Sequence, residues 1–288
     1  MPPLTAPADQ LAALSQGRAA VDLSSYRKVR ARGDDARAWL HDLVTADVAS
    51  LGPGDARRSL LLDATGHIRA DVHVARDDEG YWLFQAPEQT DHIVTALAPY
   101  VLSSDVRLDD LSAEHGLIAV LGLTEPPSTA ASFPSALGRG RDVLIGDPDE
   151  QHSWTGSLVP ASAVEVWRIL QGRARMGADF DRSTLPAEVG LESAIDITKG
   201  CFLGQESVSR VRNLGHPPRL LLHLVARRPV DAGSRLVTGD DVDAGIVTSA
   251  AANGRGDTVL LAMVPWAARA AELRSEEGVT VALVGESD

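Results

Sequence analysis

The residues best suited to chemistry lie close together in the stretch KGCFLGQESVSR, residues 199–210. It holds the single cysteine of the chain, Cys201, two residues after Lys199 and between Gly200 and Gly204. A thiolate is a nucleophile and a metal ligand, and a nearby ammonium group or a helix N-terminus favours thiolate over thiol. The residues that follow have helical spacing, so Cys201 is expected just before a helix. A buried, inert cysteine that packs as a small hydrophobe is the alternative.

Composition excludes several classes of protein. The formal charge of -13 opposes non-specific binding to nucleic acid and binding to an anionic membrane surface. One cysteine cannot form an internal disulfide, nor alone supply the thiolates of an iron–sulfur cluster or a structural zinc site. The eight histidines include no pair at the i,i+4 spacing of a zinc peptidase, and we assign no metal. No apolar run approaches the ~20 residues of a membrane span, so we expect a soluble cytoplasmic protein.

The elements that must position the thiol divide into three segments. Residues 1–20 read as a flexible N-terminal lead with a short helix, and not as a signal peptide. Residues 21–215 alternate between strand-like and helix-like segments, which predicts an α+β body of two interleaved subdomains. The sequence LGHPPRL breaks this pattern, and residues 216–288 contain short β-rich runs between turns. We therefore expect a C-terminal antiparallel β-barrel domain.

Within the first half of the body, Asp34 is expected to cap a helix over DARAWLHDLVTADV. The stretch SLLLDATGHIRADVHVAR predicts two strands around a turn at residues 64–66, and GYWLFQAP predicts a third strand. A helix near DHIVTALAPY and strands at VRLDDLS and GLIAVLGL follow.

The second half predicts strands at RDVLIG, SWTGSLVP and IDIT. In the helix ASAVEVWRILQG, a core-facing stripe would consist of Val164, Trp167 and either Leu170 or Gln171. Beyond the junction, WAARAAELRSEE at residues 266–277 predicts one helical insertion in the barrel.

The octapeptide KGCFLGQE, residues 199–206, resembles the signature of the YgfZ family of folate-binding proteins, which are relatives of the glycine-cleavage aminomethyltransferase. The resemblance extends over residues 35–84, with Leu-Val-Thr-x-Asp-Val and Leu-Asp-x-x-Gly-x-Ile, and over residues 166–206. It implies two related α+β subdomains around a central hole for the pterin, followed by a C-terminal barrel.

For function, the resemblance implies a tetrahydrofolate-binding accessory protein that supports iron–sulfur enzymes and tRNA modification. Its partners would be a reduced folate and iron–sulfur enzymes or assembly proteins. A tetrahydrofolate-dependent aminomethyl or one-carbon transferase is the first alternative, and an interaction scaffold without folate is the second.

Asp71 matches the pattern of the relatives, whereas Leu170 departs from it. Asp71 occupies the place of the transferase's catalytic aspartate, where a carboxylate could exchange a proton with the folate amine; a solvent-exposed aspartate at a sheet edge is the other interpretation. Arg168 and Gly172 match an Arg-Leu-Glu-x-Gly stretch, but Leu170 stands where its glutamate hydrogen-bonds the pterin. Leucine accepts no hydrogen bond, so folate binding is weakened unless Gln171 or Glu165 substitutes.

The resemblance thus implies a functional thiol site and a folate site. Catalytic roles fall to Cys201, Lys199 and Asp71, and cofactor binding to Asp71, Trp167, Arg168, Gln171, Gly200, Gln205, Glu206 and Arg212. A basic group of Lys199, Arg210, Arg212 and Arg219 would suit the carboxylates of a folate tail. A solvated helix face with a Glu206–Arg210 pair is the alternative for Arg210.

Overall fold

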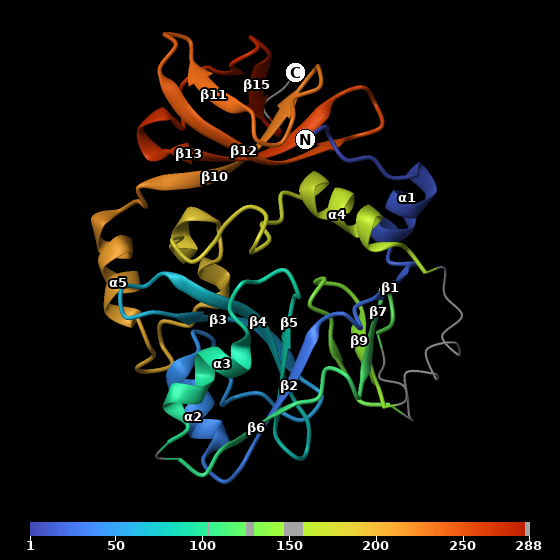
Figure 1. Ribbon diagram of the computed structural model, residues 1–288, viewed down its shortest axis with the longest axis vertical. Helices are drawn as coiled ribbons and strands as arrows, with labels where there is room; N and C mark the ends of the chain where they lie inside the picture. The colour runs from blue at the N-terminus through green and yellow to red at the C-terminus, as the bar shows by residue number, and fades with distance from the viewer. Residues whose placement is uncertain (103, 125–129, 147–157, 286–288) are drawn as a thin grey trace. The chain divides into compact units, whose positions relative to one another are not determined.

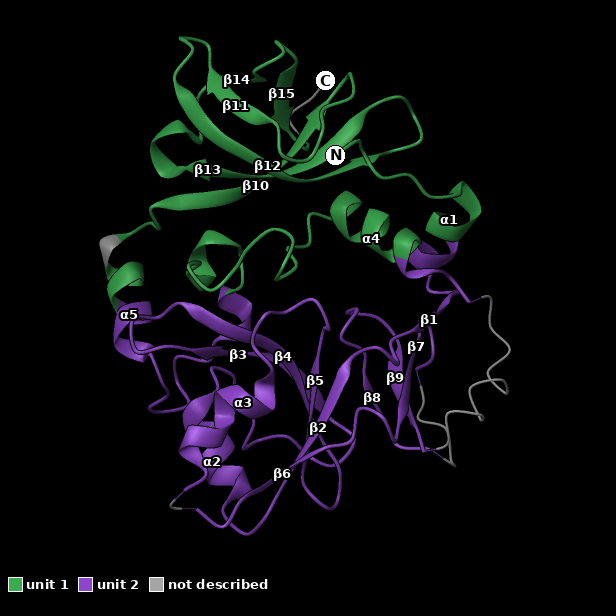
Figure 2. Cartoon of the chain, viewed as in Figure 1, with its two compact units in different colours: residues 1–12, 162–191, 210–288 green, residues 13–161, 192–209 purple. Residues whose placement is uncertain are grey.

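The computed structural model describes residues 1–102, 104–124, 130–146 and 158–285 (Figure 1). By its contacts the chain forms two compact units, coloured separately in Figure 2. Unit 1 consists of residues 1–12, 162–191 and 210–288, and unit 2 of residues 13–161 and 192–209. The segment boundaries 1–20, 21–215 and 216–288 stay a prediction.

Unit 2 contains a five-stranded antiparallel sheet in the order β3-β4-β5-β2-β6. Its strands are β2 (Arg27–Arg32), β3 (Ala56–Leu62), β4 (Ile68–Arg76), β5 (Tyr81–Gln85) and β6 (Arg107–Asp110). The three predicted strands and the turn at residues 64–66 are confirmed. In β4, Ala70, Val72 and Val74 face a buried core, so Asp71 and His73 lie on the opposite face of the sheet.

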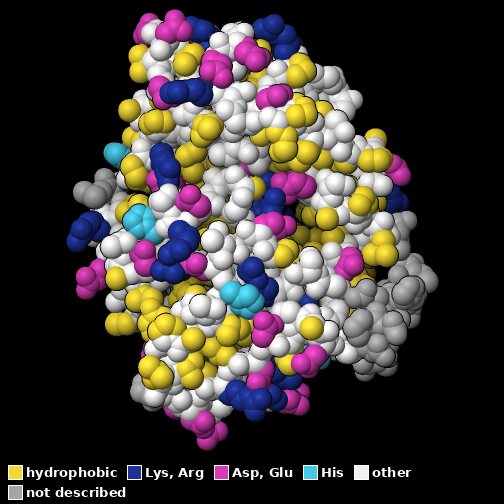
Figure 3. Space-filling view, viewed as in Figure 1, with side chains coloured by type: hydrophobic (Ala, Val, Ile, Leu, Met, Phe, Trp, Pro, Cys, Tyr) yellow, Lys and Arg dark blue, Asp and Glu magenta, His cyan; other side chains and the backbone are white. Residues whose placement is uncertain are grey.

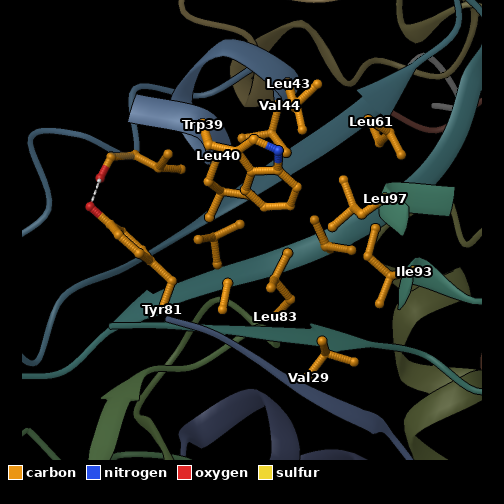
Figure 4. Close-up of a cluster of buried hydrophobic side chains, with 14 of the residues drawn as sticks. Val29, Trp39, Leu40, Leu43, Val44, Leu61, Tyr81, Leu83, Ile93 and Leu97 are labelled. Carbon is orange, nitrogen blue, oxygen red and sulfur yellow. Dashed lines mark hydrogen bonds between the residues drawn. The ribbon is translucent and has the colours of Figure 1, made fainter. Parts of the chain in front are cut away.

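That core lies between the sheet and two helices, α2 (Ala36–Leu43) and α3 (Ile93–Leu97), which cover one face of it (Figure 1). Figure 4 shows Trp39 and Leu40 of α2 directed toward Leu83 of the sheet, and Tyr81 donating a hydrogen bond to the Val48 carbonyl at 3.3 Å. The predicted cap at Asp34 is wrong. The N-cap is Asp35, whose carboxylate accepts from the backbone N–H of Asp105 at 2.8 Å instead of capping its own helix.

A second, four-stranded sheet completes unit 2 in the order β1-β7-β9-β8. Its strands are β1 (Ala20–Asp22), β7 (Gly116–Val120), β8 (Ser132–Pro134) and β9 (Arg141–Ile145). Phe133 contacts Phe84 of the first sheet with ring centroids 5.9 Å apart, and His73 Nε2 lies 2.7 Å from the Pro134 carbonyl oxygen. The two sheets therefore pack through the face that carries Asp71. The strand predicted at residues 153–160 lies largely outside the described residues.

Unit 1 is built on a closed antiparallel barrel in the order β10-β13-β12-β11-β14-β15. Its strands are β10 (Arg219–Ala226), β11 (Arg235–Thr238), β12 (Asp243–Ala252), β13 (Thr258–Pro265), β14 (Leu273–Ser275) and β15 (Thr280–Leu283). The α+β class and the C-terminal barrel are confirmed. The helix predicted at 266–277 is wrong, because only Trp266–Ala268 form a 3-10 turn. Leu273 and Ser275 are buried in β14, whose pairing with β11 and β15 closes the barrel.

The structure describes three further α-helices. They are α1 (Ala8–Gln16), α4 (Ala161–Leu170) and α5 (Gln205–Leu214), with 3-10 turns at Ala98–Tyr100, Pro186–Glu188 and Glu192–Ala194. The short helix expected near the N-terminus and the helix after Cys201 are confirmed. Among the described residues, no helix has the length and apolar character needed to span a membrane.

Candidate functional site

The chain leading to Cys201 is a turn and not the predicted strand. We call residues 195–204, between the 3-10 turn Glu192–Ala194 and α5, the KGC loop. The carboxylate of Asp196 accepts hydrogen bonds from the backbone N–H and the hydroxyl of Thr198 at 2.8 and 2.7 Å, and these bonds lower the pKa of Asp196. The N–H of Asp196 donates to the carbonyl oxygen of Thr45 at 2.9 Å. Local side-chain bonds thus replace a strand ladder.

Lys199 is bound to helix α2. Its ammonium group donates to the backbone carbonyl of His41 in the last turn of α2, while the ring Nε2 of His41 lies 3.0 Å from the carbonyl oxygen of Lys199. A cation at the C-terminus of a helix meets the partial negative charge of the unpaired carbonyl groups. Burial lowers the pKa of Lys199 to about 8, against the attraction of Asp42, Asp47 and Asp196.

Cys201 is exposed, whereas Phe202, the next residue, is 7% exposed. The ammonium nitrogen of Lys199 lies 5.5 Å from the centre of the Phe202 ring, so the residues on both sides of Gly200 and Cys201 are held. The thiol therefore projects from a loop anchored before and after it. Burial as an inert hydrophobe is wrong for this cysteine.

Two glycines and a glutamine shape the end of the KGC loop. Gly200 and Gly204 have φ values of 102° and 83°, which side chains rarely adopt. A Cβ atom at Gly204 would collide with the carbonyl oxygen of Asp63, whereas one at Gly200 would meet open space. The side-chain oxygen of Gln205 accepts from the N–H of Phe202 at 3.3 Å, and Glu206 is exposed. Gln205 therefore supports the loop from the first turn of α5.

An open cavity of about 320 Å³ adjoins the start of the KGC loop. It is lined by Ala46, Arg57, Ser193, Ala194, Ile195, Asp196 and Ile197. None of these residues was predicted from the sequence, because the lining comes from segments about 140 residues apart that no motif connects. The contact of His41 with Lys199 likewise has no sequence signal. The described residues hold no group of three or more His, Cys, Asp or Glu placed for a metal ion.

Asp71 is an ion-paired residue of an interior strand and not an exposed aspartate at a sheet edge. Arg58 of β3 donates from Nε to Oδ1 of Asp71 at 2.8 Å and from Nη2 to Oδ2. The backbone of Asp71 is fixed by Gln89, whose side chain accepts from its N–H at 3.0 Å and donates to its carbonyl at 2.7 Å. The Asp71 side chain is 14% exposed. Both carboxylate oxygens already have a partner.

Arg168 is a structural residue within unit 1. Its Nε donates to Glu165 at 2.8 Å, Nη1 donates to Asp179 and to the Arg173 carbonyl at 3.0 Å, and Nη2 donates to Glu165 and to the Ser249 hydroxyl at 2.9 Å. A guanidinium group has five N–H donors, and all five are used. Arg168 therefore connects α4 to β12 and has no donor left for a ligand.

The other predicted folate residues of unit 1 differ in exposure. Trp167 is 4% exposed, and the Arg173 guanidinium lies 5.1 Å from the centre of the Trp167 ring. The indole Nε1 of Trp167 has no hydrogen-bond acceptor among the described residues. Leu170 packs against the apolar cluster of α4 and β13, so it cannot face a polar ligand group as well. The predicted stripe of α4 is wrong except at Trp167: Val164 and Leu170 are only partly buried and Gln171 is exposed. The buried face instead carries Ala163, Val166 and Ile169, all at 0% exposure.

The predicted basic group is not supported as a single cluster. Lys199 is bound at the end of α2, and Arg219 pairs with Glu188 at 2.8 Å. Arg210 and Arg212 are exposed on α5. The structure thus brings Lys199, Gly200 and Cys201 together in the KGC loop, with Gln205 and Glu206 in the first turn of α5 and Asp71 on a sheet of the same unit. Trp167, Arg168, Gln171 and Arg212 belong to the other unit.

Comparisons with known proteins agree with this architecture. Residues 5–128 match the family model of the GCVT N-terminal domain. Among solved structures, aminomethyltransferase T of the glycine cleavage system from Bartonella henselae matches with a TM-score of 0.79 at 20% identity, over 98% of this chain and 90% of that one. This likeness establishes the fold.

Three curated relatives carry different descriptions. An aminomethyltransferase from Streptomyces avermitilis is 27% identical over 90% of this chain and 81% of its own length. A tRNA-modifying protein YgfZ from Colwellia psychrerythraea is 24% identical, with coverages of 71% and 70%. A mitochondrial iron–sulfur cluster assembly factor IBA57 homolog from Pyricularia oryzae is 26% identical, with coverages of 79% and 61%.

Proposed function

Because the chain is a YgfZ-like protein of the aminomethyltransferase (GcvT) family, we propose that it is a reduced-folate-binding accessory protein that supports iron–sulfur enzymes and tRNA modification. Cys201 serves as its working thiol. The observation that carries the proposal is the exposure of Cys201 on a loop whose neighbours, Lys199 and Phe202, are both held. An exposed thiol at a fixed position is what exchange with a partner protein requires.

The thiol step is an exchange with a client protein. The Cys201 thiolate attacks one sulfur of a client disulfide, a new S–S bond joins the two proteins, and the other client sulfur leaves as a thiolate. A second thiol from the client or from the cellular thiol pool then releases Cys201. The client is an iron–sulfur enzyme or an assembly protein, in keeping with the description of the IBA57 homolog.

Tetrahydrofolate or a derivative is the proposed cofactor, and the residues of unit 1 fit it only in part. Trp167 supplies a buried indole N–H without an acceptor among the described residues, and a folate offers carbonyl and carboxylate acceptors. Arg173 lies over the same ring. Leu170 and the saturated Arg168 contribute nothing polar. Trp167 would therefore donate one hydrogen bond to the folate, and the exposed Gln171 would substitute for the missing glutamate.

Partner choice follows from charge. On the face drawn in Figure 3, lysines and arginines are interspersed with aspartates and glutamates, and the described residues form no broad patch of one sign there. Together with the net charge of -13, this favours protein clients over direct non-specific contact with nucleic acid. A cytoplasmic location, as expected from the sequence, belongs to the same proposal.

Aminomethyl transfer to tetrahydrofolate is disfavoured. That chemistry needs a carboxylate beside the folate amine, and Arg58 occupies both oxygens of Asp71. Each oxygen keeps a further lone pair, but the bidentate ion pair with Arg58 engages the carboxylate in a structural contact. The relationship to aminomethyltransferases therefore describes ancestry and fold better than activity.

The decisive experiment is complementation in cells that lack the protein. We expect Cys201→Ser to behave like the empty vector when the activity of iron–sulfur enzymes is measured, because serine has nearly the same volume but no thiol. Thr198→Ser is the matched control, since serine keeps the hydroxyl that bonds Asp196. Full activity of Cys201→Ser would refute the role of Cys201 as a working thiol.

Folate binding is tested separately by calorimetric titration of the purified protein with tetrahydrofolate and folinic acid. Saturable binding supports the cofactor. Its absence up to about 1 mM, which corresponds to less than about 4 kcal/mol of affinity, would leave an interaction scaffold without folate.

A further inference from the structure

His41 and Lys199 lie 158 positions apart in the sequence and make two contacts. In each contact the side chain of one residue meets the backbone carbonyl of the other. The Lys199 ammonium donates to the backbone carbonyl of His41, and the His41 ring contacts the backbone carbonyl of Lys199 at 3.0 Å. We propose that His41 is the positioning residue of the KGC loop, which sets the place of Cys201 relative to helix α2. This role rests on the proposed function only in that Cys201 is taken as the working thiol.

The contacts of the ring define which nitrogen carries the proton. A carbonyl oxygen only accepts, so Nε2 must carry the hydrogen that it donates to Lys199. The other nitrogen, Nδ1, accepts the N–H of Ala49 at 3.4 Å and lies 3.4 Å from a carboxylate oxygen of Asp47. Both ring nitrogens are thus directed by neighbours, and the ring orientation is set from both sides.

Helix α2 is a rigid support for this contact. Leu40 is fully buried and Leu43 is 8% exposed in the core between α2 and the five-stranded sheet, on either side of His41. Cys201 follows Lys199 by two residues, and a Cβ atom added to the intervening Gly200 would have no neighbouring atom within 4 Å. On its N-terminal side the position of the exposed thiol therefore depends on the two bonds at Lys199, because Gly200 itself makes no side-chain contact.

The test uses three variants and amide hydrogen exchange followed by mass spectrometry. In His41→Ala the ring bond to Lys199 is lost. We expect exchange of the peptide spanning residues 199–204 to become about five- to tenfold faster, the effect of one net hydrogen bond on a local opening. Exchange in β4 stays unchanged, because that strand has its own ladder.

The conservative variant separates positioning from a loss of packing volume. In His41→Gln the side-chain amide reaches the place of Nε2 and can donate to Lys199, so exchange returns to the wild-type rate. In His41→Asn the amide reaches only the place of Nδ1, so exchange is accelerated as in His41→Ala. Equal rates in wild type and His41→Ala, or equal acceleration in the Gln and Asn variants, would overturn the proposal.

The Gln and Asn pair decides the question even if His41→Ala does not fold. The rate of Cys201 alkylation by iodoacetamide gives a second readout, which we expect to change in His41→Asn and not in His41→Gln. Neither readout depends on cellular function. If His41→Asn accelerates exchange in the KGC loop but complements fully, the positioning role of His41 is supported. The same result would contradict the role of Cys201 as a working thiol.

Discussion

Arg58 holds both carboxylate oxygens of Asp71, with its Nε at 2.8 Å from Oδ1. The two residues are diagonal neighbours on adjacent strands, since Leu60 is paired with Asp71 and Arg58 with His73. Asp71 is 14% exposed and Arg58 is 41% exposed. Without the ion pair, the carboxylate would therefore be left largely buried, whereas the guanidinium could still reach water. Asp71, which the sequence resemblance predicts at a catalytic position, makes a structural ion pair here.

This relationship predicts unequal effects for the two partners. Arg58→Ala leaves a largely buried carboxylate without its donor and should lower the free energy of unfolding by about 1–3 kcal/mol. Asp71→Asn should cost less, because an amide oxygen still accepts one bond and Arg58 can turn to water. Urea denaturation followed by circular dichroism compares them, and a larger cost for Asp71→Asn would contradict the assignment.

Arg168 should be more important for folding than for binding. Replacement by Met removes the charge that faces Asp179, whose side chain is fully buried, and should cost about 3–5 kcal/mol of unfolding free energy. Arg212→Met, at an exposed position of α5, serves as the control and should change stability by less than about 0.5 kcal/mol. Thermal unfolding of both variants is the measurement. Similar midpoints for the two would refute the structural role.

The lowered pKa of Lys199 can be read directly, because the chain has only two lysines, Lys28 and Lys199. Lys28 is fully buried and donates to the carbonyls of Ser24 and Tyr26, both at 2.7 Å. Acetylation at Lys199, quantified by mass spectrometry, should therefore rise with pH through a midpoint near the pKa of about 8. A midpoint near the ordinary value of 10.5 would mean that the ammonium group is not desolvated.

The same pKa shift has a consequence for stability. The folded state loses the Lys199 proton at about pH 8 and the unfolded chain at about 10.5, so the unfolded state holds more protons within that window. The contribution of Lys199 to stability therefore rises with pH between these values and is constant below about pH 8. Denaturation of wild type and Lys199→Met at pH 7 and pH 10 should show a larger rise in wild type, because Lys28, whose pKa is also lowered by burial, is present in both.

Two glycines of the KGC loop provide a matched pair. Gly204→Ala and Gly200→Ala both place a side chain at positive φ, which costs about 1–2 kcal/mol. Only the Cβ atom at residue 204 meets the Asp63 carbonyl oxygen, so Gly204→Ala should have the lower unfolding midpoint of the two. Equal midpoints would mean that the loop is not pressed against the turn between β3 and β4.

Trp167→Phe tests the folate contact. Removing an indole N–H that has no acceptor among the described residues costs no hydrogen bond, so any loss of stability comes from the smaller buried ring. If that N–H binds the folate, calorimetry should give an affinity about fivefold weaker, the value of about 1 kcal/mol for one hydrogen bond. Trp82→Phe is the control, because its N–H already donates to Asp77 at 2.9 Å. Unchanged affinity in Trp167→Phe would remove this residue from the proposed site.

Much of the fold was predictable because it depends on local patterns. Apolar runs on either side of turn residues identified β3 to β5, and the helical spacing after Gly204 identified α5. The octapeptide KGCFLGQE was sufficient to indicate the family. Local signals failed where distant chain segments decide the outcome. WAARAAELRSEE has helical propensity, but closing the barrel requires β14, and strand pairing outweighs propensity there.

The sequence by itself determined the class of fold, the family and the chemistry available to the one thiol. Only the tertiary structure decided what each charged site residue does. Arg58, Glu165 and Asp179, and the end of α2, are the partners that occupy Asp71, Arg168 and Lys199 respectively. The physical reason is that a charged side chain acts according to the groups that face it after folding. Those groups come from other strands and helices, whose positions no short motif records.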